Sequence, residues 1–404
     1  MQKDSVVRME ATTIDDAIAK LIDIYDTSTK LAKETLNNED YAAYADVVYP
    51  KLTVDVLEWK PIDRTEPFGY VDRAGRYSAT LSKPRVIERY LREQLERLTS
   101  NYPCKIYVSE SDIRIPPEYI RGAPSATEAR RAGDVADIIP RPTLDEVHDA
   151  IIDGDWHAFN GPELPLFHFG PQRFDIACAR IEHYTGINVE HVQKYILFTN
   201  YAMHTTEFVH FAMSELTSED SRYVGLSLPN GQVIDRETAT SLGTETLDLT
   251  SRFQMPRYDL ITEAGDGITI INIGVGPSNA KTITDCLAVL RPEAWVMIGH
   301  CAGMDARMRI GDLILGNAYQ REDHILDKRI SLGNPIPAIP EIQKALEASV
   351  DEIYGSDNSL MRTGTVLSTD DRNWEWHTPE DLCNWLTGST AAAVDMESST
   401  LATN

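Results

Sequence analysis

Short, almost continuous apolar runs alternate with helical patterns through the second part of the chain, and this alternation restricts the possible folds most strongly. A strand that is apolar on both faces must be covered on both faces, which favours a largely parallel sheet between layers of helices. We therefore predict an α/β domain with a mostly parallel central sheet. The predicted strands are residues 195–201, 268–276, 294–300, 310–319, 362–369 and 391–396.

The first part of the chain mixes helices and strands without that alternation. Thr13 and Asp16 predict the start of a helix that reaches about Leu36, because a threonine followed by an acid three residues later caps helices. A second helix is predicted after Pro84. Strands are predicted on either side of it, so the pattern indicates a smaller α+β domain. Residues 121–165 are rich in Arg, Gly, Pro and Asp, so we predict domains at 1–165 and 166–404.

The formal net charge of -25 argues against a nucleic acid or an anionic membrane as a partner, because such a field repels both. A small anionic ligand is still possible, since one or two buried cations bind it locally. The five cysteines show no CxxC spacing, so no metal site is predicted. The N-terminus has no apolar signal segment and no window is long and apolar enough to span a membrane. We expect a cytoplasmic protein.

A glycine-rich turn joins a predicted strand to a helix at residues 274–279. Gly274 and Gly276 allow a tight turn, while Ser278 could cap the helix and Asn279 adds a polar side chain. Free backbone N–H groups at such a turn favour an anionic or polar ligand. The alternative is an ordinary strand-to-helix turn, because the spacing matches no dinucleotide or triphosphate motif.

A second small-residue turn follows the strand 294–300. His300, Cys301 and Ala302 lie there, and small residues let a flat ring approach the backbone. The alternative is a connection in which His300 has a structural partner. A nucleophilic role for Cys301 is disfavoured, because the sequence shows no partner base for it.

An acidic motif ends the last predicted strand. Glu397 could accept hydrogen bonds from two vicinal sugar hydroxyls, and Met396 could give an apolar contact to the sugar. The alternative is structural: Asp395 and Glu397 would then stabilise the N-terminus of the following helix.

Residues 368–375 combine two acids, a cation, an amide and an indole. An aromatic ring beside hydrogen-bonding groups suits purine recognition, so Asp371, Arg372, Asn373 and Trp374 are candidate base-binding residues. The alternative is a solvated loop anchored by Trp374.

Taken in order, these motifs resemble the superfamily of purine nucleoside phosphorylases and nucleosidases. The longer phrases YILFTNY, QMPRYDLIT, IGVGPSNAKT and TDDRNWE are similar to the AMP nucleosidase family, as are VVYPKLTVDV and FGYVDRAGRYSATLSKP nearer the N-terminus. The resemblance implies hydrolysis of AMP to adenine and ribose 5-phosphate. The fold that it implies is an αβα phosphorylase-type domain with a mostly parallel or mixed central sheet, preceded by a smaller α+β N-terminal domain. The resemblance also implies a homo-hexamer with no required cofactor, activated allosterically by ATP with Mg.

The resemblance implies roles for individual residues. Glu397 would hold the ribose 2′- and 3′-hydroxyls beside Met396, and Cys301 and Ala302 would face the sugar and the base. The turn at 274–279 would lie on the nucleophile side or the phosphate side. Further substrate-binding candidates are Asn200, Tyr201, His300, Asp371, Arg372, Asn373 and Trp374.

Three further candidates come from position in the sequence and not from the resemblance. Glu207, on the helix after FTNY, is the candidate general base. Lys281 and Arg372 are candidate 5′-phosphate ligands, and the alternative is that either is a surface cation.

Two departures from the superfamily pattern matter. Met297 stands where the phosphorylases place a phosphate-binding arginine, which favours water over phosphate as the nucleophile. In the superfamily another strand follows the helix after Glu397. An aspartate at the end of that strand hydrogen-bonds or protonates the purine leaving group. We therefore expect a catalytic domain that is incomplete at its C-terminus. The alternatives are a nucleotide-binding fragment with little or no activity, and a purine nucleoside phosphorylase.

Overall fold

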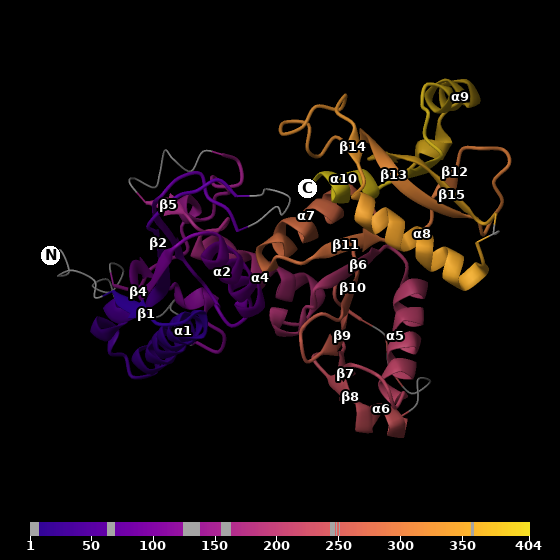
Figure 1. The fold of residues 1–404 in the computed structure, drawn as a ribbon. Coiled ribbons are helices and arrows are strands. Elements are labelled where there is room, and N and C mark those ends of the chain that lie inside the picture. Colours follow the sequence, from indigo (N-terminus) through magenta and orange to yellow (C-terminus); the bar gives the residue numbers. More distant parts are fainter. Residues whose placement is uncertain are drawn as a thin grey trace. The chain divides into compact units, whose positions relative to one another are not determined.

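The computed structural model describes residues 8–62, 69–123, 138–154, 163–242, 247, 249, 251–356 and 359–404 (Figure 1). It divides into two compact units, Met1–Arg180 with Val289–Arg291, and Ile181–Ala288 with Pro292–Asn404. The domain boundary at residue 165 stays a prediction. Much of the expected linker, residues 124–137 and 155–162, lies outside the described residues.

The first unit contains a five-stranded sheet in the order β1-β4-β2-β3-β5 and the two predicted helices. Thr13 caps α1 by accepting a hydrogen bond from the backbone N–H of Asp16, which confirms the predicted start of this helix. The mixture confirms an α+β unit. Its elements are β1 (Met9–Ala11), α1 (Ile14–Asn37), β2 (Val48–Val56), β3 (Gly75–Thr80), α2 (Glu88–Asn101), β4 (Cys104–Arg114) and β5 (Leu164–Pro165).

The second unit contains two mixed sheets. In the six-stranded sheet, ordered β11-β6-β10-β9-β7-β8, β6 pairs in parallel with both β10 and β11, and the other pairs are antiparallel. Its strands are β6 (Tyr195–Thr199), β7 (Tyr223–Ser227), β8 (Val233–Asp235), β9 (Arg257–Thr262), β10 (Ile268–Asn272) and β11 (Ala294–Met297).

The second sheet of this unit has five strands in the order β12-β16-β15-β13-β14, with β13, β15 and β16 parallel. Its strands are β12 (Ala302–Gly303), β13 (Leu313–Glu322), β14 (Ile336–Pro337), β15 (Met361–Thr369) and β16 (Ala393–Asp395). The α/β class and the mixed pairing are confirmed. The predicted strands form but fall into two sheets instead of one, because apolar runs report burial and do not specify which strands pair.

Helices cover the sheets of the second unit. On α5 (Ala202–Thr217), the side chains of Phe208, Ala212 and Leu216 recur at helical spacing and share one core cluster with Tyr258 and Ile270. Figure 1 shows α5 beside the strands β10, β9 and β7. The other helices are α4 (Pro171–Thr185), which contains the unit boundary, α6 (Arg236–Leu242), α7 (Pro277–Leu287), α8 (Pro340–Tyr354), α9 (Pro379–Thr387) and α10 (Ser398–Thr403). No helix within the described ranges is long and apolar enough to cross a membrane.

The parallel strands β11, β6 and β10 end at one edge of their sheet. Open α/β sheets bind ligands outside the carboxyl ends of such strands. The connections that leave these ends carry His300, Asn200 and Gly276, three of the predicted site residues.

Candidate active site

The Glu397 side chain joins the end of the second sheet to the connections of the first. Glu397 lies between β16 and α10, and only 2% of it is exposed. Its Oε1 accepts a 2.6 Å hydrogen bond from the backbone N–H of Gly276, and its Oε2 accepts a 3.3 Å bond from Asn200 Nδ2. Two of the predicted site motifs therefore converge on one buried carboxylate.

Gly276 has a backbone conformation that suits glycine. Its φ of +111° lies in the region that side chains avoid, and it begins α7 with Pro277 in the first turn. Ser278 makes no capping hydrogen bond, so the predicted cap is wrong. Gly274 donates its N–H to Asn272 Oδ1, while Asn279 Nδ2 lies beside Gly274. The turn therefore gives the Gly276 N–H to Glu397.

Asp395 has a structural position although it belongs to the same motif. Its carboxylate accepts hydrogen bonds from the hydroxyls of Ser368 and Ser398 and from the Ser398 backbone N–H at 3.0 Å. The structural alternative therefore holds for Asp395, because this carboxylate stabilises the start of α10. It does not hold for Glu397, whose side chain makes no capping hydrogen bond to that helix. Met396 between them is half-buried and is not part of the cavity wall.

The pKa of Glu397 is raised to about 7, mainly because burial disfavours the charged carboxylate. The Gly276 N–H opposes this shift by stabilising the ionised form, while the neighbouring charge of Asp395 adds to it. Burial also raises the pKa of Asp395. A carboxylate whose pKa lies near neutrality is typical of functional sites.

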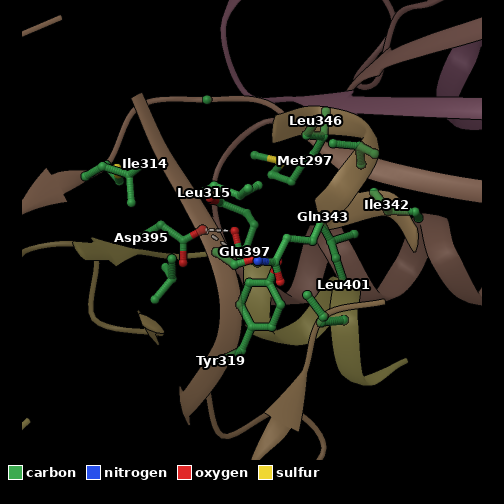
Figure 2. Close-up of a pocket in the computed structure, with 18 of the residues that line it drawn as sticks. Met297, Ile314, Leu315, Tyr319, Ile342, Gln343, Leu346, Asp395, Glu397 and Leu401 are labelled. Atoms are coloured by element: carbon green, nitrogen blue, oxygen red, sulfur yellow. Dashed lines mark hydrogen bonds between the residues drawn. The ribbon is translucent and has the colours of Figure 1, made fainter. Parts of the chain in front are cut away.

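A cavity of about 230 Å³ opens beside Glu397 (Figure 2). Figure 2 shows Met297, Tyr319, Gln343 and Leu346 gathered around this carboxylate. Sequence reasoning missed the walls formed by β13 and α8, because the apolar stripe of α8 predicts only that one helix face is covered. The walls include Trp295, Gly299, His300, Cys301, Ile314, Gly316, Ile342, Asp395 and Leu401.

Two imidazoles and a phenol cluster beside the cavity. The ring centroids of Tyr201 and His300 are 4.2 Å apart, and those of His204 and His300 are 5.6 Å apart. His204 Nδ1 lies 2.7 Å from Thr199 Oγ1, and burial followed by the proximity of His300 lowers the His204 pKa. The rings of Tyr201 and His204 therefore pack beside the His300 imidazole, which lines the cavity.

Cys301 and Ala302 complete this turn. Ala302 pairs with Val394, which ties the turn to the strand that leads to Glu397. The Cys301 residue is exposed overall, yet desolvation of its thiol and the charge of Asp395 raise the thiol pKa. A raised pKa reduces the thiolate fraction and disfavours a nucleophilic cysteine.

The structure does not bring Glu207 to the cavity. Its side chain is 73% exposed on α5, where it lies 3.9 Å from His210 Nδ1. Glu207 therefore has no observed geometric link to Glu397.

The loop that contains the predicted base-binding residues also lies outside the cavity wall. Asp371 accepts hydrogen bonds from the Asn373 backbone N–H and from the His377 ring, and Arg372 is exposed. Trp374 packs against Trp385 with ring centroids 5.6 Å apart. In this structure the loop matches the alternative of a solvated segment anchored by Trp374.

Neither candidate 5′-phosphate ligand lines the cavity. Lys281 forms an ion pair with Asp285 one turn along α7, and Arg372 lies in the solvated loop. Within the described residues, no group of three or more His, Cys, Asp or Glu side chains is arranged to hold a metal ion.

A buried ion network contacts the first turn of α10, directly after Glu397, and sequence reasoning missed its role. Asp323 accepts hydrogen bonds from Arg321 and from the hydroxyls of Ser399 and Thr400, the first residues of α10 after Ser398. The side chains of Arg321 and Asp323 are fully buried. The run of three charged residues at 321–323, at the end of β13, was the available signal, since a strand in a covered sheet rarely carries charges without partners.

Comparisons with known proteins identify the relatives of this chain. Residues 16–163 match the model of the bacterial AMP nucleoside phosphorylase N-terminus, and residues 243–403 match that of the phosphorylase superfamily. AMP nucleosidase of Escherichia coli K12 is 39% identical over 393 residues, which cover 96% of this chain and 79% of that protein, and the protein of E. coli O157:H7 matches equally.

Among solved structures, AMP nucleosidase from Bacteroides thetaiotaomicron aligns with a TM-score of 0.42 at 24% identity, over 57% of this chain and 80% of that one. Purine nucleoside phosphorylase from Toxoplasma gondii aligns with a TM-score of 0.39 at 16% identity, over 54% and 72%. These structural likenesses are too weak to carry an argument. The sequence identity is decisive: this chain belongs to the AMP nucleosidase family.

Proposed function

We propose that this chain hydrolyses the N-glycosidic bond of AMP and releases adenine and ribose 5-phosphate. One observation carries the proposal: the buried Glu397 carboxylate lies where the connections after β6 and β10 meet the end of β16. The proteins of the same family that align along almost the whole chain are named AMP nucleosidases, which supports AMP as the substrate.

Ionised Glu397 supplies the chemistry that this bond cleavage needs. Breaking the bond between C1′ and N9 develops positive charge on the sugar and negative charge on the purine. A carboxylate that accepts hydrogen bonds from the ribose 2′- and 3′-hydroxyls orients the sugar and offsets its positive charge. Gly276 and Asn200 each use one hydrogen-bonding position of Glu397, so lone pairs remain for the hydroxyls.

The cavity wall supports hydrolysis over phosphorolysis. Met297, a neutral thioether, lines the cavity on β11, and nothing at this position could hold a phosphate anion. Water is small, neutral and abundant, so it needs no such clamp. The turns at 274–276 and 300–302 would then face the sugar and the nucleophile.

We further propose a cytoplasmic homo-hexamer that Mg-ATP activates allosterically. The family resemblance supports these three properties, and the composition agrees with the compartment. Size measurement by light scattering and AMP hydrolysis with and without Mg-ATP would test the assembly and the activation.

Incubation of the chain with AMP and Mg-ATP tests the main proposal. We expect adenine and ribose 5-phosphate, at a rate that added inorganic phosphate does not increase. Formation of a sugar phosphorylated at C1′ that requires phosphate would instead indicate a phosphorylase. AMP binding without any release of adenine would contradict the proposed hydrolysis.

A further inference from the structure

The proposed hydrolysis requires a group that takes a proton from the attacking water, and the inference below rests on that proposed function. Such a base must lie in the cavity beside Glu397, because the water attacks the sugar that Glu397 holds. A free lone pair is also required, since a general base accepts the proton through a direct hydrogen bond or through one water.

The carboxylates do not meet these two conditions. Glu397 already accepts hydrogen bonds on both oxygens. In the proposed function its remaining lone pairs accept from the sugar hydroxyls. Asp395 is held by Ser368 and Ser398. Glu207 lies on the exposed face of α5 beside His210.

His300 meets both conditions. It lines the cavity together with Glu397, and its side chain is exposed at the carboxyl end of β11. Within the described part of the chain, neither ring nitrogen of His300 has a hydrogen-bond partner. The neighbouring rings pack beside the imidazole, with centroid distances to the His300 ring of 4.2 Å for Tyr201 and 5.6 Å for His204.

His204 has a different role from His300. Its Nδ1 is engaged by Thr199 at 2.7 Å, and burial favours its neutral form. A neutral neighbour does not repel the imidazolium that forms when His300 takes a proton. The tyrosine ring adds an aromatic face beside that charge, which also favours a cation.

We propose that His300 is the general base of this site. A water oxygen forms a bond to C1′ as the bond from C1′ to N9 breaks, and the electron pair of the broken bond leaves with the purine. His300 accepts the proton that the water loses. The purine takes a proton from solvent, and His300 later returns its own, so the sum is AMP plus water giving adenine and ribose 5-phosphate.

Two substitutions separate proton transfer from ring contact. His300→Gln keeps a polar side chain, and His300→Phe keeps the aromatic contact with Tyr201, but neither accepts a proton. We expect kcat for AMP hydrolysis to fall about 10²- to 10⁴-fold in both. Added imidazole should restore part of the activity of the variants, and KM should change little. His210→Gln, an exposed histidine on α5, serves as the matched control and should keep the wild-type kcat.

The pH profile gives a readout that a structural role would not move. The titratable side chains near His300 are Tyr201 and His204, whose rings lie beside it, and four that line the same cavity: Cys301, Tyr319, Asp395 and Glu397. A general base acts only in its unprotonated form, so both His300 and Glu397 contribute to the fall of log kcat/KM on the acid side. In His300→Gln this fall should be less steep, because only Glu397 remains.

Each result decides the inference. A wild-type kcat in both His300 variants would overturn it. A loss of activity in His300→Gln together with full activity in His300→Phe would also overturn it, because it would show that only the ring contact is needed. Loss in both variants without imidazole rescue and with an unchanged pH slope would also overturn it. If the wild-type chain releases no adenine from AMP while it still binds AMP, the proposed function fails instead.

Discussion

The Gly276 backbone N–H donates a hydrogen bond of 2.6 Å to Glu397 Oε1 across 121 residues of sequence. This bond joins the turn after β10 to the residue that precedes α10. It orients the carboxylate and partly compensates the free energy that burial of its charge costs. The site therefore depends on two sequence motifs that have no local connection.

Replacing Glu397 by Gln should remove the charge and keep the shape of the side chain. The glutamine oxygen can still accept from Gly276, so the fold is expected to persist. We expect kcat for AMP hydrolysis to fall at least about 10²-fold, because an electrostatic contact to the developing charge is lost. Steady-state kinetics measure this, and an active variant would remove Glu397 from the proposed mechanism.

The activity should rise as the pH increases through about 7. Burial raises the pKa of Glu397 to about that value, and only the ionised form accepts both sugar hydroxyls. We therefore expect kcat/KM to decline below neutrality. A profile that stays flat between pH 5 and 8 would show that Glu397 is ionised throughout or is not required.

The same shift predicts how stability depends on pH. Because the folded-state pKa exceeds the ordinary value of 4.5, the contribution of Glu397 is favourable below that value and is lost as the pH rises through about 7. The wild type should lose roughly 2–3 kcal/mol more free energy of unfolding between pH 5 and 8 than Glu397→Gln does. Urea titration of both proteins at the two pH values provides the comparison.

The conformation of Gly276 can be tested with a matched glycine. Gly276→Ala forces a side chain into φ +111°, and Gly231→Ala does so at φ +83°; neither added Cβ would meet an atom within 4 Å. Both changes should cost about 1–3 kcal/mol of stability. Only Gly276→Ala should also reduce AMP hydrolysis, because it displaces the N–H that holds Glu397. Equal activities in two folded variants would contradict the role of this bond.

The buried network under α10 predicts a large loss of stability. Asp323→Ala removes the buried carboxylate partner of Arg321, which keeps the partly exposed Asp327 and the Ile330 carbonyl as acceptors. It also removes the acceptor of the Ser399 and Thr400 hydroxyls. We expect a loss of about 3–5 kcal/mol in the free energy of unfolding. Asp327→Ala, whose side chain is 38% exposed, should cost much less. Denaturant unfolding distinguishes the two variants. Similar losses of unfolding free energy would show that the buried Arg321–Asp323 pair contributes no more to stability than the exposed pair with Asp327.

The sequence alone determined the local features of this protein. The cap at Thr13, the apolar runs of β6, β10 and β11, and the glycine turn after β10 are readable because capping, burial and backbone conformation depend on neighbouring residues. The phrases shared with a known family identified that family across both units. Glu397 was found in this way, as an acid placed directly after a strand.

Only the tertiary structure decided which residues of the separate motifs contact one another. The Gly276 N–H and Asn200 donate hydrogen bonds to Glu397, and Asp395 accepts from Ser398 at the start of α10. Trp374 packs against Trp385 and does not line the cavity. The tertiary structure also divided the strands of the second unit between two sheets. The physical reason is that periodicity reports whether a side chain is covered, whereas strand pairing across a hundred residues decides which group covers it.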